Sequence, residues 1–287
     1  MKCQLLSGKK PHDKLEPEIK KELDSLPIKP CLLSISIGID SSKEVYVKNK
    51  MKLAESLGFG FEFKMFDEHV SYKDILDYVQ NAIDKREITG VIFERPTHKE
   101  ELENLLDEIP PEYDIDGLGS TNLGSLIKGK PIMISATAQA VLHILDFYGI
   151  NTEGQSVVVV GRSPNVGLSI SLLLLSKSRN ATVTVCHSKT KGLPFFTRNA
   201  DILISSAGKP WLINADMVKD NAVVVDVGFN VVEQDGKRIF AGDVDFEGVK
   251  DKVRAITPVP GGVGQLTPLF LVKNLIKAAR IISERER

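Results

Sequence analysis

Few residues of this sequence are suited to hold disulfide bonds or metal ions. Three of the 287 residues are cysteines, and Cys3, Cys31 and Cys186 lie far apart, with no pair at the spacing of metal ligands. This scarcity excludes a small disulfide-stapled fold, and we expect no metal site. Motifs of a Ser/His/Asp triad or of a Walker-type phosphate loop are absent as well.

Long apolar runs and an excess of charge are also missing. The N-terminus has no apolar signal region, and no uninterrupted apolar run approaches the length of a membrane span. The formal net charge is -1 at pH 7, which argues against non-specific binding to nucleic acid. We therefore expect a soluble cytoplasmic protein with no nucleic-acid or membrane partner.

What is present is an alternation of strand-like and helical segments. Short runs rich in Val and Ile end in glycine or small polar residues, and helical stretches separate most of them, which predicts parallel βαβ units. For 287 residues, two α/β domains are the simplest organisation. The expected strands are 31–38, 59–66, 90–93, 156–160, 182–186, 202–206 and 223–227, and the expected helices are 15–26, 45–57, 72–85, 100–108, 138–148 and 269–284.

One expected strand runs directly into a glycine turn. The segment 157–160 consists of four valines and is followed by Gly161, a polar turn, Gly167 and the leucine-rich segment 168–175. This order is typical of the phosphate-binding turn of a dinucleotide fold, in which a helix start offers unpaired N–H groups to a pyrophosphate. Ser163 stands where the middle glycine would be, so the motif also fits an ordinary strand–helix turn.

The next expected strand bears on the choice of cofactor. Folds that prefer NAD place an acidic residue about twenty residues after the glycine turn, where it bonds the ribose 2′-hydroxyl. Here the strand 182–186 leads into His187-Ser188-Lys189-Thr190-Lys191, which holds no carboxylate. This neutral-to-basic loop, together with Arg162 in the first turn, suits a 2′-phosphate and predicts NADP rather than NAD. The same residues would also fit a plain solvated loop.

Three further places carry side chains that suit catalysis or substrate binding. Tyr46 and Lys50 share one face of an expected helix, where a ring can stack a flat ligand beside an amine, or where the two form a plain surface pair. Glu94 directly follows a buried strand, and on its own it fits a solvated loop carboxylate. The string Asp114-Ile115-Asp116-Gly117 offers a carboxylate to an amino-heterocycle, or forms a turn.

The string Thr257-Pro258-Val259-Pro260-Gly261-Gly262-Val263-Gly264 is the most unusual in the chain. Its prolines and glycines predict a rigid loop with few side chains, whose backbone can lie against a ligand.

Together these strings resemble the bifunctional methylenetetrahydrofolate dehydrogenase/methenyltetrahydrofolate cyclohydrolase family over nearly the whole chain. The resemblance implies NADP-dependent oxidation of 5,10-methylenetetrahydrofolate to 5,10-methenyltetrahydrofolate, hydrolysis of that product to 10-formyltetrahydrofolate, and a homodimer. It rests on Tyr46-Val47-Lys48-Asn49-Lys50, Asp114-Ile115-Asp116-Gly117, Gly161-Arg162-Ser163 with Val166-Gly167, Cys186-His187-Ser188-Lys189-Thr190, Asp226-Val227-Gly228, Gly242-Asp243-Val244 and residues 257–264.

The resemblance also implies domains and site residues. An N-terminal folate domain would span residues 1–138, joined by the C-terminal helix 268–287, and a Rossmann-like NADP domain would span 139–267, with a cleft between them. The catalytic residues would be Lys50, Tyr46 and Asp116, with Lys50 as the catalytic lysine, and we count Glu94, a departure from the family pattern, among the catalytic residues as well. Substrate binding would involve Tyr46, Asp116, Gly261, Gly262 and Val263. The cofactor site would comprise Gly161, Arg162, Ser163, Gly167, His187, Ser188, Ala207, Gly208, Gly228, Phe229 and Thr267.

The sequence departs from the family pattern mainly on the folate side. Glu94 stands where the family usually has glutamine, and Arg95-Pro96-Thr97-His98 follows in place of a proline-rich segment. An anionic Glu94 would favour the ammonium form of Lys50, whereas a lysine base must be neutral. Glu94 is therefore protonated, weakens the hydrolysis or shares in the proton transfer. The sequence also fits an enzyme that acts on a modified tetrahydropterin, and a non-catalytic paralogue that binds pterin or NADP.

Overall fold

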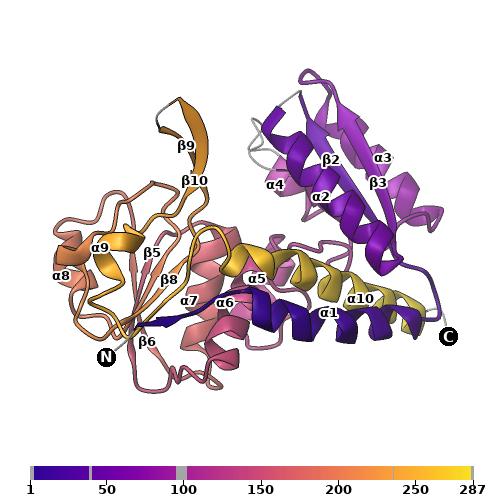
Figure 1. The fold of residues 1–287 in the computed structure, drawn as a ribbon. Coiled ribbons are helices and arrows are strands. Elements are labelled where there is room, and N and C mark those ends of the chain that lie inside the picture. The colour runs from indigo at the N-terminus through magenta and orange to yellow at the C-terminus, as the bar shows by residue number, and fades with distance from the viewer. Residues whose placement is uncertain (1–2, 39–40, 95–101, 235, 286–287) are drawn as a thin grey trace. The chain divides into compact units, whose positions relative to one another are not determined.

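The chain forms two compact units, which are described here one by one. The computed structural model describes residues 3–38, 41–94, 102–234 and 236–285, and at 41–46, 102, 103, 234 and 237 it describes the backbone alone (Figure 1). Unit 1 comprises Met1–Lys14 and Thr137–Thr267, and unit 2 comprises Leu15–Ala136 and Pro268–Arg287. The α/β fold class expected from the sequence is confirmed.

The described residues of unit 1 form a six-stranded parallel sheet in the order β1-β11-β8-β7-β5-β6. Every residue of β7 and β8 is buried, because both faces of these Val- and Ile-rich strands are covered. The strands are β1 (Gln4–Leu5), β5 (Ser156–Val160), β6 (Thr182–Cys186), β7 (Ile202–Ser205), β8 (Val223–Asp226) and β11 (Ala255–Ile256).

Two features of unit 1 were not expected from the sequence. The start of the chain pairs with β11 through β1, so residues 1–14 group with unit 1, whereas the expected boundaries placed them in the N-terminal domain. The strands β9 (Asn230–Gln234) and β10 (Lys237–Ala241) form an antiparallel hairpin that extends from the rest of the unit (Figure 1).

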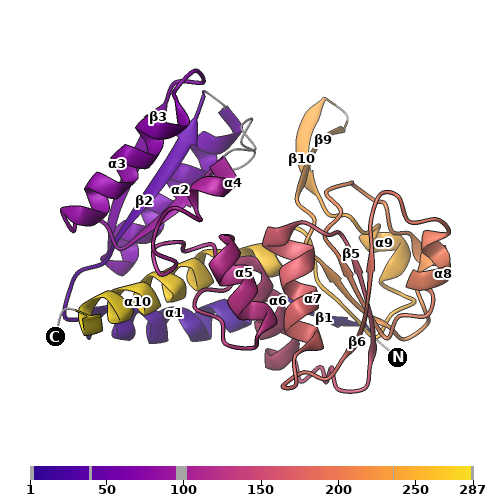
Figure 2. The same ribbon diagram turned by 180° about the vertical axis from the view of Figure 1, so that it is seen from behind.

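Unit 2 contains a three-stranded parallel sheet in the order β3-β2-β4, formed by β2 (Cys31–Ile37), β3 (Gly60–Phe66) and β4 (Gly90–Phe93). Asp114 adds a parallel bridge to Val91, which extends this sheet beyond β4. The helices α2 (Ser41–Leu57) and α3 (Tyr72–Asp84) lie on opposite faces of the sheet, as the two views show (Figure 1 and Figure 2).

Alternation along β2 decides which side chains meet which helix. Leu33, Ile35 and Ile37 join the core that contains Ile75 and Val79 of α3. Ser34, between them, points to the opposite face because successive strand residues alternate. The face beside α2 therefore carries polar groups.

The remaining helices connect and cover these sheets. None of the helices in the described ranges is both long and apolar enough to cross a membrane. They are α1 (Lys9–Asp24), α4 (Leu102–Leu105), α5 (Ser120–Ile127), α6 (Ala136–Phe147), α7 (Ser169–Leu175), α8 (Leu193–Thr197), α9 (Phe246–Val249) and α10 (Thr267–Arg285), with single turns η1 (Pro164–Leu168), η2 (Ala215–Met217) and η3 (Val263–Gln265).

Candidate functional site

A charged pair lies at the carboxyl end of β4 in unit 2. The Nζ atom of Lys50, from α2, is 2.7 Å from Oε1 and 2.8 Å from Oε2 of Glu94. The Ser34 hydroxyl donates a third hydrogen bond to Oε1 at 2.5 Å. Glu94 is 6% exposed and the Lys50 side chain 20% exposed. The sequence did not show that these side chains touch, and it gave no role to Ser34.

The carboxyl group of Glu94 is well satisfied for a buried group. Its oxygens accept two hydrogen bonds from Lys50 and one from Ser34. A carboxylate this deeply buried is tolerated when a cation and hydrogen bonds compensate the loss of water, and Lys50 with Ser34 supplies both. The two side chains therefore form an ion pair in which Lys50 remains partly open to solvent.

The two aspartates of the acidic turn at residues 114–117 have different surroundings. Asp114 is fully buried, and it accepts hydrogen bonds from the backbone of Gly117 (3.0 Å) and Gly119 (2.8 Å) and from Nδ2 of Asn122 (2.8 Å). Burial raises the pKa of the Asp114 carboxyl, although these donors oppose the shift. Asp116 is half-buried. Asp114 thus builds the turn, and Asp116 is the less buried of the two carboxylates.

Contacts from α10 fix the backbone next to Asp116 and join it to the segment that contains Ile134. Asn274 of α10 donates from Nδ2 to the carbonyl oxygens of Ile115 and Ile134, each at 2.7 Å. Because Asp114 bridges to Val91 in parallel, Asp116 and Glu94 both follow their strands at the same edge of the unit 2 sheet. The sequence-predicted residues Lys50, Glu94 and Asp116 are therefore brought to one edge.

Two other predictions on this side fall on residues that are not described in full. Tyr46 lies one turn before Lys50 in α2, but its side chain lies outside the described part. The departing segment Arg95 to His98 lies wholly outside the described residues.

The glycine turn of unit 1 is as tight as its sequence predicts. Gly161 has φ +134°, and a Cβ atom there would lie 2.3 Å from Oγ and 2.4 Å from the carbonyl oxygen of Ser206. A Cβ atom on Gly167 would lie 2.2 Å from the carbonyl oxygen of Gly161. Arg162 and Ser163, between the two glycines, are exposed. The turn thus leaves its backbone and two polar side chains open at the strand end.

The loop after β6 is ordered by its own polar groups. Thr190 Oγ1 accepts the backbone N–H of His187 (2.8 Å), and His187 Nδ1 accepts the backbone N–H of Lys189 (3.2 Å). Ser188 is exposed. These residues follow β6, the neighbour of β5, so they lie at the same sheet edge as the glycine turn.

Two buried aspartates hold the other strand-end loops of unit 1, and sequence reasoning gave them no role. Asp226, at the end of β8, accepts backbone N–H bonds from Gly228 (2.9 Å), Asp243 (3.0 Å) and Val244 (2.9 Å). Asp243 accepts backbone N–H bonds from Ala207 (2.6 Å), Gly208 (3.2 Å) and Lys209 (2.9 Å). Burial raises the pKa of Asp226 to about 7. The sequence marks both aspartates only as members of strings that carry the family resemblance, Asp226-Val227-Gly228 and Gly242-Asp243-Val244.

The proline- and glycine-rich segment after β11 is rigid for identifiable reasons. Gly261 has φ +110°, and a Cβ atom on Gly262 would lie 2.6 Å from the carbonyl oxygen of Pro258. The backbone N–H of Gly8 donates to the Gly261 carbonyl at 2.8 Å. Val263 is buried, and Thr267 begins α10 with its hydroxyl 3.4 Å from the Val263 carbonyl. These residues belong to unit 1, whereas Lys50, Glu94 and Asp116 belong to unit 2.

Phe229 is the remaining residue of the expected cofactor site. Its side chain is 46% exposed and stacks on Phe240 of the hairpin, with ring centroids 4.8 Å apart. In the described ranges, no group of three or more His, Cys, Asp or Glu residues is arranged to hold a metal ion.

The chain is similar to one family along almost all of its length. Residues 6–116 match the family described as tetrahydrofolate dehydrogenase/cyclohydrolase, catalytic domain, and residues 135–283 match the NAD(P)-binding domain of the same family. The bifunctional protein FolD of Dictyoglomus turgidum is 45% identical over 281 residues, which cover 96% of this chain and 98% of that protein.

Solved structures give the same picture. The bifunctional enzyme FolD, a methylenetetrahydrofolate dehydrogenase/cyclohydrolase, from Campylobacter jejuni superposes with a TM-score of 0.90 at 35% identity, covering 98% of this chain and 99% of that chain. The methylenetetrahydrofolate dehydrogenase-cyclohydrolase of Trypanosoma brucei, solved with NADP and an inhibitor, gives a TM-score of 0.91 at 29% identity, with 99% of each chain covered.

Proposed function

We propose, from the premise that this chain belongs to the tetrahydrofolate dehydrogenase/cyclohydrolase family, a bifunctional enzyme of one-carbon metabolism. It oxidises 5,10-methylenetetrahydrofolate to 5,10-methenyltetrahydrofolate with NADP, and it hydrolyses that product to 10-formyltetrahydrofolate. The observation that carries the hydrolytic half is the Lys50–Glu94 pair at the edge of the unit 2 sheet.

The residues of unit 1 fit a dinucleotide. Gly161 and Gly167 leave no room for a Cβ atom, so this backbone is built to lie close to its neighbours. Arg162 and the loop around Ser188 present no carboxylate to a 2′-phosphate. When bound, NADP supplies the acceptor for the hydride. The chain contributes the turn at Gly161, the loop at Ser188, the strand-end residues Ala207, Gly208, Gly228 and Phe229, and Thr267 at the start of α10, which would hold it.

The oxidation needs positioning more than acid–base chemistry. The cation left on the methylene carbon is stabilised by the nitrogens bonded to that carbon, so no protein group has to move a proton. Asp116 would accept hydrogen bonds from the pterin, and Tyr46 would stack on its ring. The backbone of residues 261–263 would lie against the substrate. Holding two reactants in place can contribute several kcal/mol, roughly 7 to 11 at best.

The hydrolysis needs a base, and Lys50 is the group that the geometry offers. Water adds to the methenyl carbon and gives a proton to the neutral amine; the C–N bond then breaks as a proton reaches the leaving nitrogen. Glu94 and Ser34 fix the amine, but the carboxylate also favours the ammonium form. The positive charge of the substrate opposes Glu94. The balance between the two sets the pH at which Lys50 can act.

A direct assay tests both halves. Purified protein with 5,10-methylenetetrahydrofolate should reduce NADP, followed by absorbance, and in a separate reaction it should consume 5,10-methenyltetrahydrofolate faster than buffer does. Oxidation of a modified tetrahydropterin but not of the folate would replace the substrate. No turnover with any carrier would leave a pterin- or NADP-binding protein and overturn the proposal.

We further propose that the enzyme works in the cytoplasm as a homodimer. The family resemblance supports both points. The exposed apolar side chains of the hairpin region, Phe229 (46% exposed), Val231 (57%) and Phe240 (51%), support the dimer. Analytical ultracentrifugation should give twice the chain mass, and Val231→Asp should shift the protein towards monomer. A monomer at micromolar concentration would contradict the dimer, and cell fractionation of the tagged chain would test the compartment.

A further inference from the structure

The buried aspartates of unit 1 are linked in series rather than side by side. Asp226 fixes the backbone of Asp243 and Val244, and Asp243 then fixes residues 207–209. The side chain of Asn230 also donates to Asp243, at 3.1 Å. Upstream, the backbone N–H of Asp226 donates to Oγ1 of Thr257 at 2.7 Å. The series therefore runs from the loop at Thr257 to the loop at Ala207.

The backbone packs tightly against the carboxylates of Asp226 and Asp243. A Cβ atom on Gly228 would lie 2.2 Å from Cγ of Asp243, and one on Gly242 would lie 1.9 Å from Oδ2 of Asp226. The backbone thus comes into direct contact with each carboxylate. Because interiors packed this closely transmit displacements, a shift of Asp243 would move residues 207–209 with it.

The backbone N–H groups that donate to Asp226 and Asp243 belong to loops expected to bind the cofactor. Ala207, Gly208 and Gly228 are three of the residues expected to bind the cofactor, and all three donate their backbone N–H to the pair. They lie at the carboxyl ends of β7 and β8, where open parallel sheets bind ligands. Burying two carboxylates carries a free-energy cost, which a simple connector would not require.

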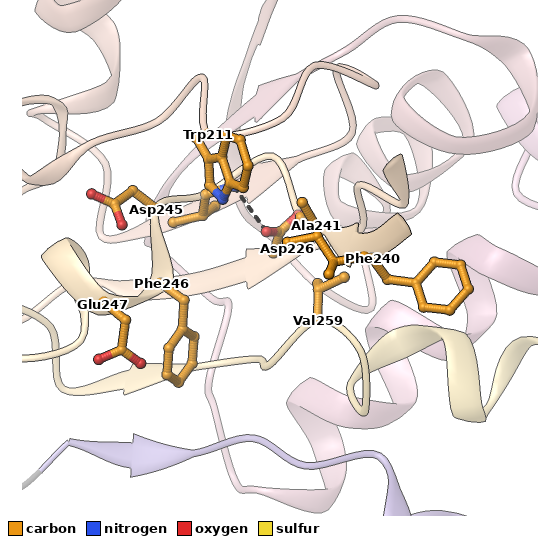
Figure 3. Close-up of a pocket in the computed structure, with 11 residues that line it drawn as sticks. Trp211, Asp226, Phe240, Ala241, Asp245, Phe246, Glu247 and Val259 are labelled. Carbon is orange, nitrogen blue, oxygen red and sulfur yellow. Dashed lines mark hydrogen bonds between the residues drawn. The ribbon is translucent and has the colours of Figure 1, made fainter. Parts of the chain in front are cut away.

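A pocket of about 230 Å³ reaches Asp226 from outside. Figure 3 shows Asp226 between Trp211 and Val259, with a dashed line to its carboxylate that marks the bond from Val244. The acidic groups that share its surroundings are Asp243, Asp245 and Glu247, and the pocket lining in the described ranges includes no basic side chain. In Figure 3 the carboxylates of Asp245 and Glu247 point away from Asp226.

We propose that Asp226 and Asp243 form a positioning pair, which sets the geometry of the loops at Ala207–Gly208 and Gly228 for binding of NADP. This inference rests on the proposed function, because it takes NADP as the ligand of those loops. Neither carboxylate is assigned contact with the cofactor. Both act through the backbone N–H groups that they hold.

The first test replaces Asp243 by asparagine. The amide keeps the size of the side chain but turns one acceptor oxygen into a donor, which faces the N–H groups of the loop. We expect the Kd for NADP, measured by calorimetry without substrate, to rise at least tenfold, while the Kd for tetrahydrofolate changes less than twofold. Hydrogen exchange of the amides at 207–209 should become faster. An unchanged Kd for NADP beside faster exchange would reduce the pair to a structural role and overturn the proposal.

Two controls keep this test decisive. Should Asp243→Asn fail to fold, Thr257→Val removes the hydroxyl that holds Asp226 and should raise the Kd for NADP, whereas Thr257→Ser should restore it. Equal affinity for NADP in Thr257→Val and Thr257→Ser would show that the hydroxyl does not act through Asp226, and it would overturn the proposal. Wild-type protein that binds no NADP would refute the proposed function itself, and that failure is visible before any variant is made.

The pH dependence of binding supplies a readout that plain packing would not move. As pH rises through the pKa of Asp226, about 7, the ionised carboxylate accepts all three N–H bonds more strongly. The affinity for NADP should therefore rise several-fold between pH 6 and pH 8. In Asp226→Asn this part of the rise should vanish, and the variant reports the titration of the NADP phosphate alone. Identical pH profiles would count against the pair.

Discussion

In unit 2 the candidate catalytic groups Lys50 and Glu94 are held by contacts between side chains. In unit 1 the candidate cofactor loops are held by hydrogen bonds from their backbone N–H groups to buried carboxylates. In unit 2, Lys50 and Glu94 meet from different elements, and a single charge decides what the pair can do. In unit 1, glycines and buried carboxylates shape the backbone, and the exposed side chains contribute little to that shape. Substitutions in unit 2 should therefore alter chemistry, and substitutions in unit 1 should alter binding.

The substitution with the largest expected effect on this difference between the units is Gly161→Ala. Gly161→Ala places a methyl group 2.3–2.4 Å from Ser206 on a backbone with φ +134°, so the turn must move. We expect the affinity for NADP to fall about 10³-fold, which corresponds to about 4 kcal/mol. Calorimetry measures this loss. Gly154→Ala is the matched control, because Gly154 also has positive φ but its Cβ would meet nothing within 4 Å. Equal losses in both variants would make backbone strain, rather than the close approach, the cause.

The pH dependence of stability tests the buried acid of unit 1. The pKa of Asp226 is raised to about 7, above that of an unfolded aspartate, so the folded state binds more protons between about pH 4 and pH 7. The stability from this group is fully present below about pH 4 and is lost as pH rises through 7. Relative to Asp226→Asn, the wild type should lose about 1.4 kcal/mol per pH unit in this window, up to about 4 kcal/mol. Urea unfolding at several pH values measures the difference.

The control for that titration is Asp245→Asn, which removes a carboxylate from the other side of the same pocket. It should leave the slope of the wild type in place. A parallel course of wild type and Asp226→Asn across the window would show that Asp226 is ionised throughout.

Removal of the amine at Lys50 breaks the side-chain site of unit 2. Lys50→Met keeps the aliphatic stem, so hydrolysis should fall on the order of 10²-fold, while oxidation falls less because it moves no proton. The variant also leaves Glu94 buried without its cation, which should cost about 3 kcal/mol of stability. Separate assays of both activities and urea unfolding measure these effects. Lys52→Met, on an exposed position of the same helix, is the control. Equal losses in both activities would make Lys50 a substrate-positioning residue.

Arg162 is the exposed side chain on which unit 1 should depend most. We expect it to pair with a 2′-phosphate, so the wild type should prefer NADP over NAD at least roughly tenfold in kcat/KM, about 1.4 kcal/mol. Arg162→Ala should abolish most of that preference, as steady-state kinetics with each cofactor will show. Arg238→Ala, exposed on the hairpin, should not change it. Equal use of both cofactors by the unmutated protein would refute the assignment.

The two units also differ in how far the sequence predicts them. Strands of continuous Val and Ile, such as β5 and β8, were located within one residue, because burial on both faces leaves a plain apolar run. The edge strand β1 and the hairpin β9–β10 were missed. The first is two exposed residues long, and the second mixes polar and apolar side chains without a clear period. The helix α1 begins at Lys9 and not at the expected Leu15, because its charged first turn hides the helical pattern.

The candidate sites show the same limit. The sequence indicates Lys50, Glu94 and Asp116 as separate candidates, but it cannot show that Lys50 contacts Glu94, 44 positions away. Ser34 was hidden because a serine within a strand carries no local signal, and its role follows only from alternation in β2. Asp243 holds loops that are distant from it in sequence, so its role is visible only in the folded chain.

The smallest expected effect is also the one that decides how Lys50 is controlled. Glu94→Gln keeps the shape of the side chain and its contact with Ser34 but removes the charge that favours the ammonium. The limb on which hydrolysis climbs with pH should move to lower pH, and the rate near neutrality should rise several-fold, with oxidation unchanged. Glu62→Gln is the matched control, since Glu62 bonds Tyr78 and makes no contact with Lys50 in the described residues.

Three results of the Glu94→Gln profile have distinct meanings, because the charge acts on hydrolysis and not on hydride transfer. A shifted limb supports a carboxylate that restrains the base. A collapse of hydrolysis with intact oxidation would mean that Glu94 itself accepts the proton, so that the ion pair works as one relay. An unchanged profile would mean that the 2.7 Å contact between Lys50 and Glu94 does not affect hydrolysis, which would then depend on Lys50 alone. In each case the variant changes one charge in unit 2 and leaves the backbone of unit 1 unchanged.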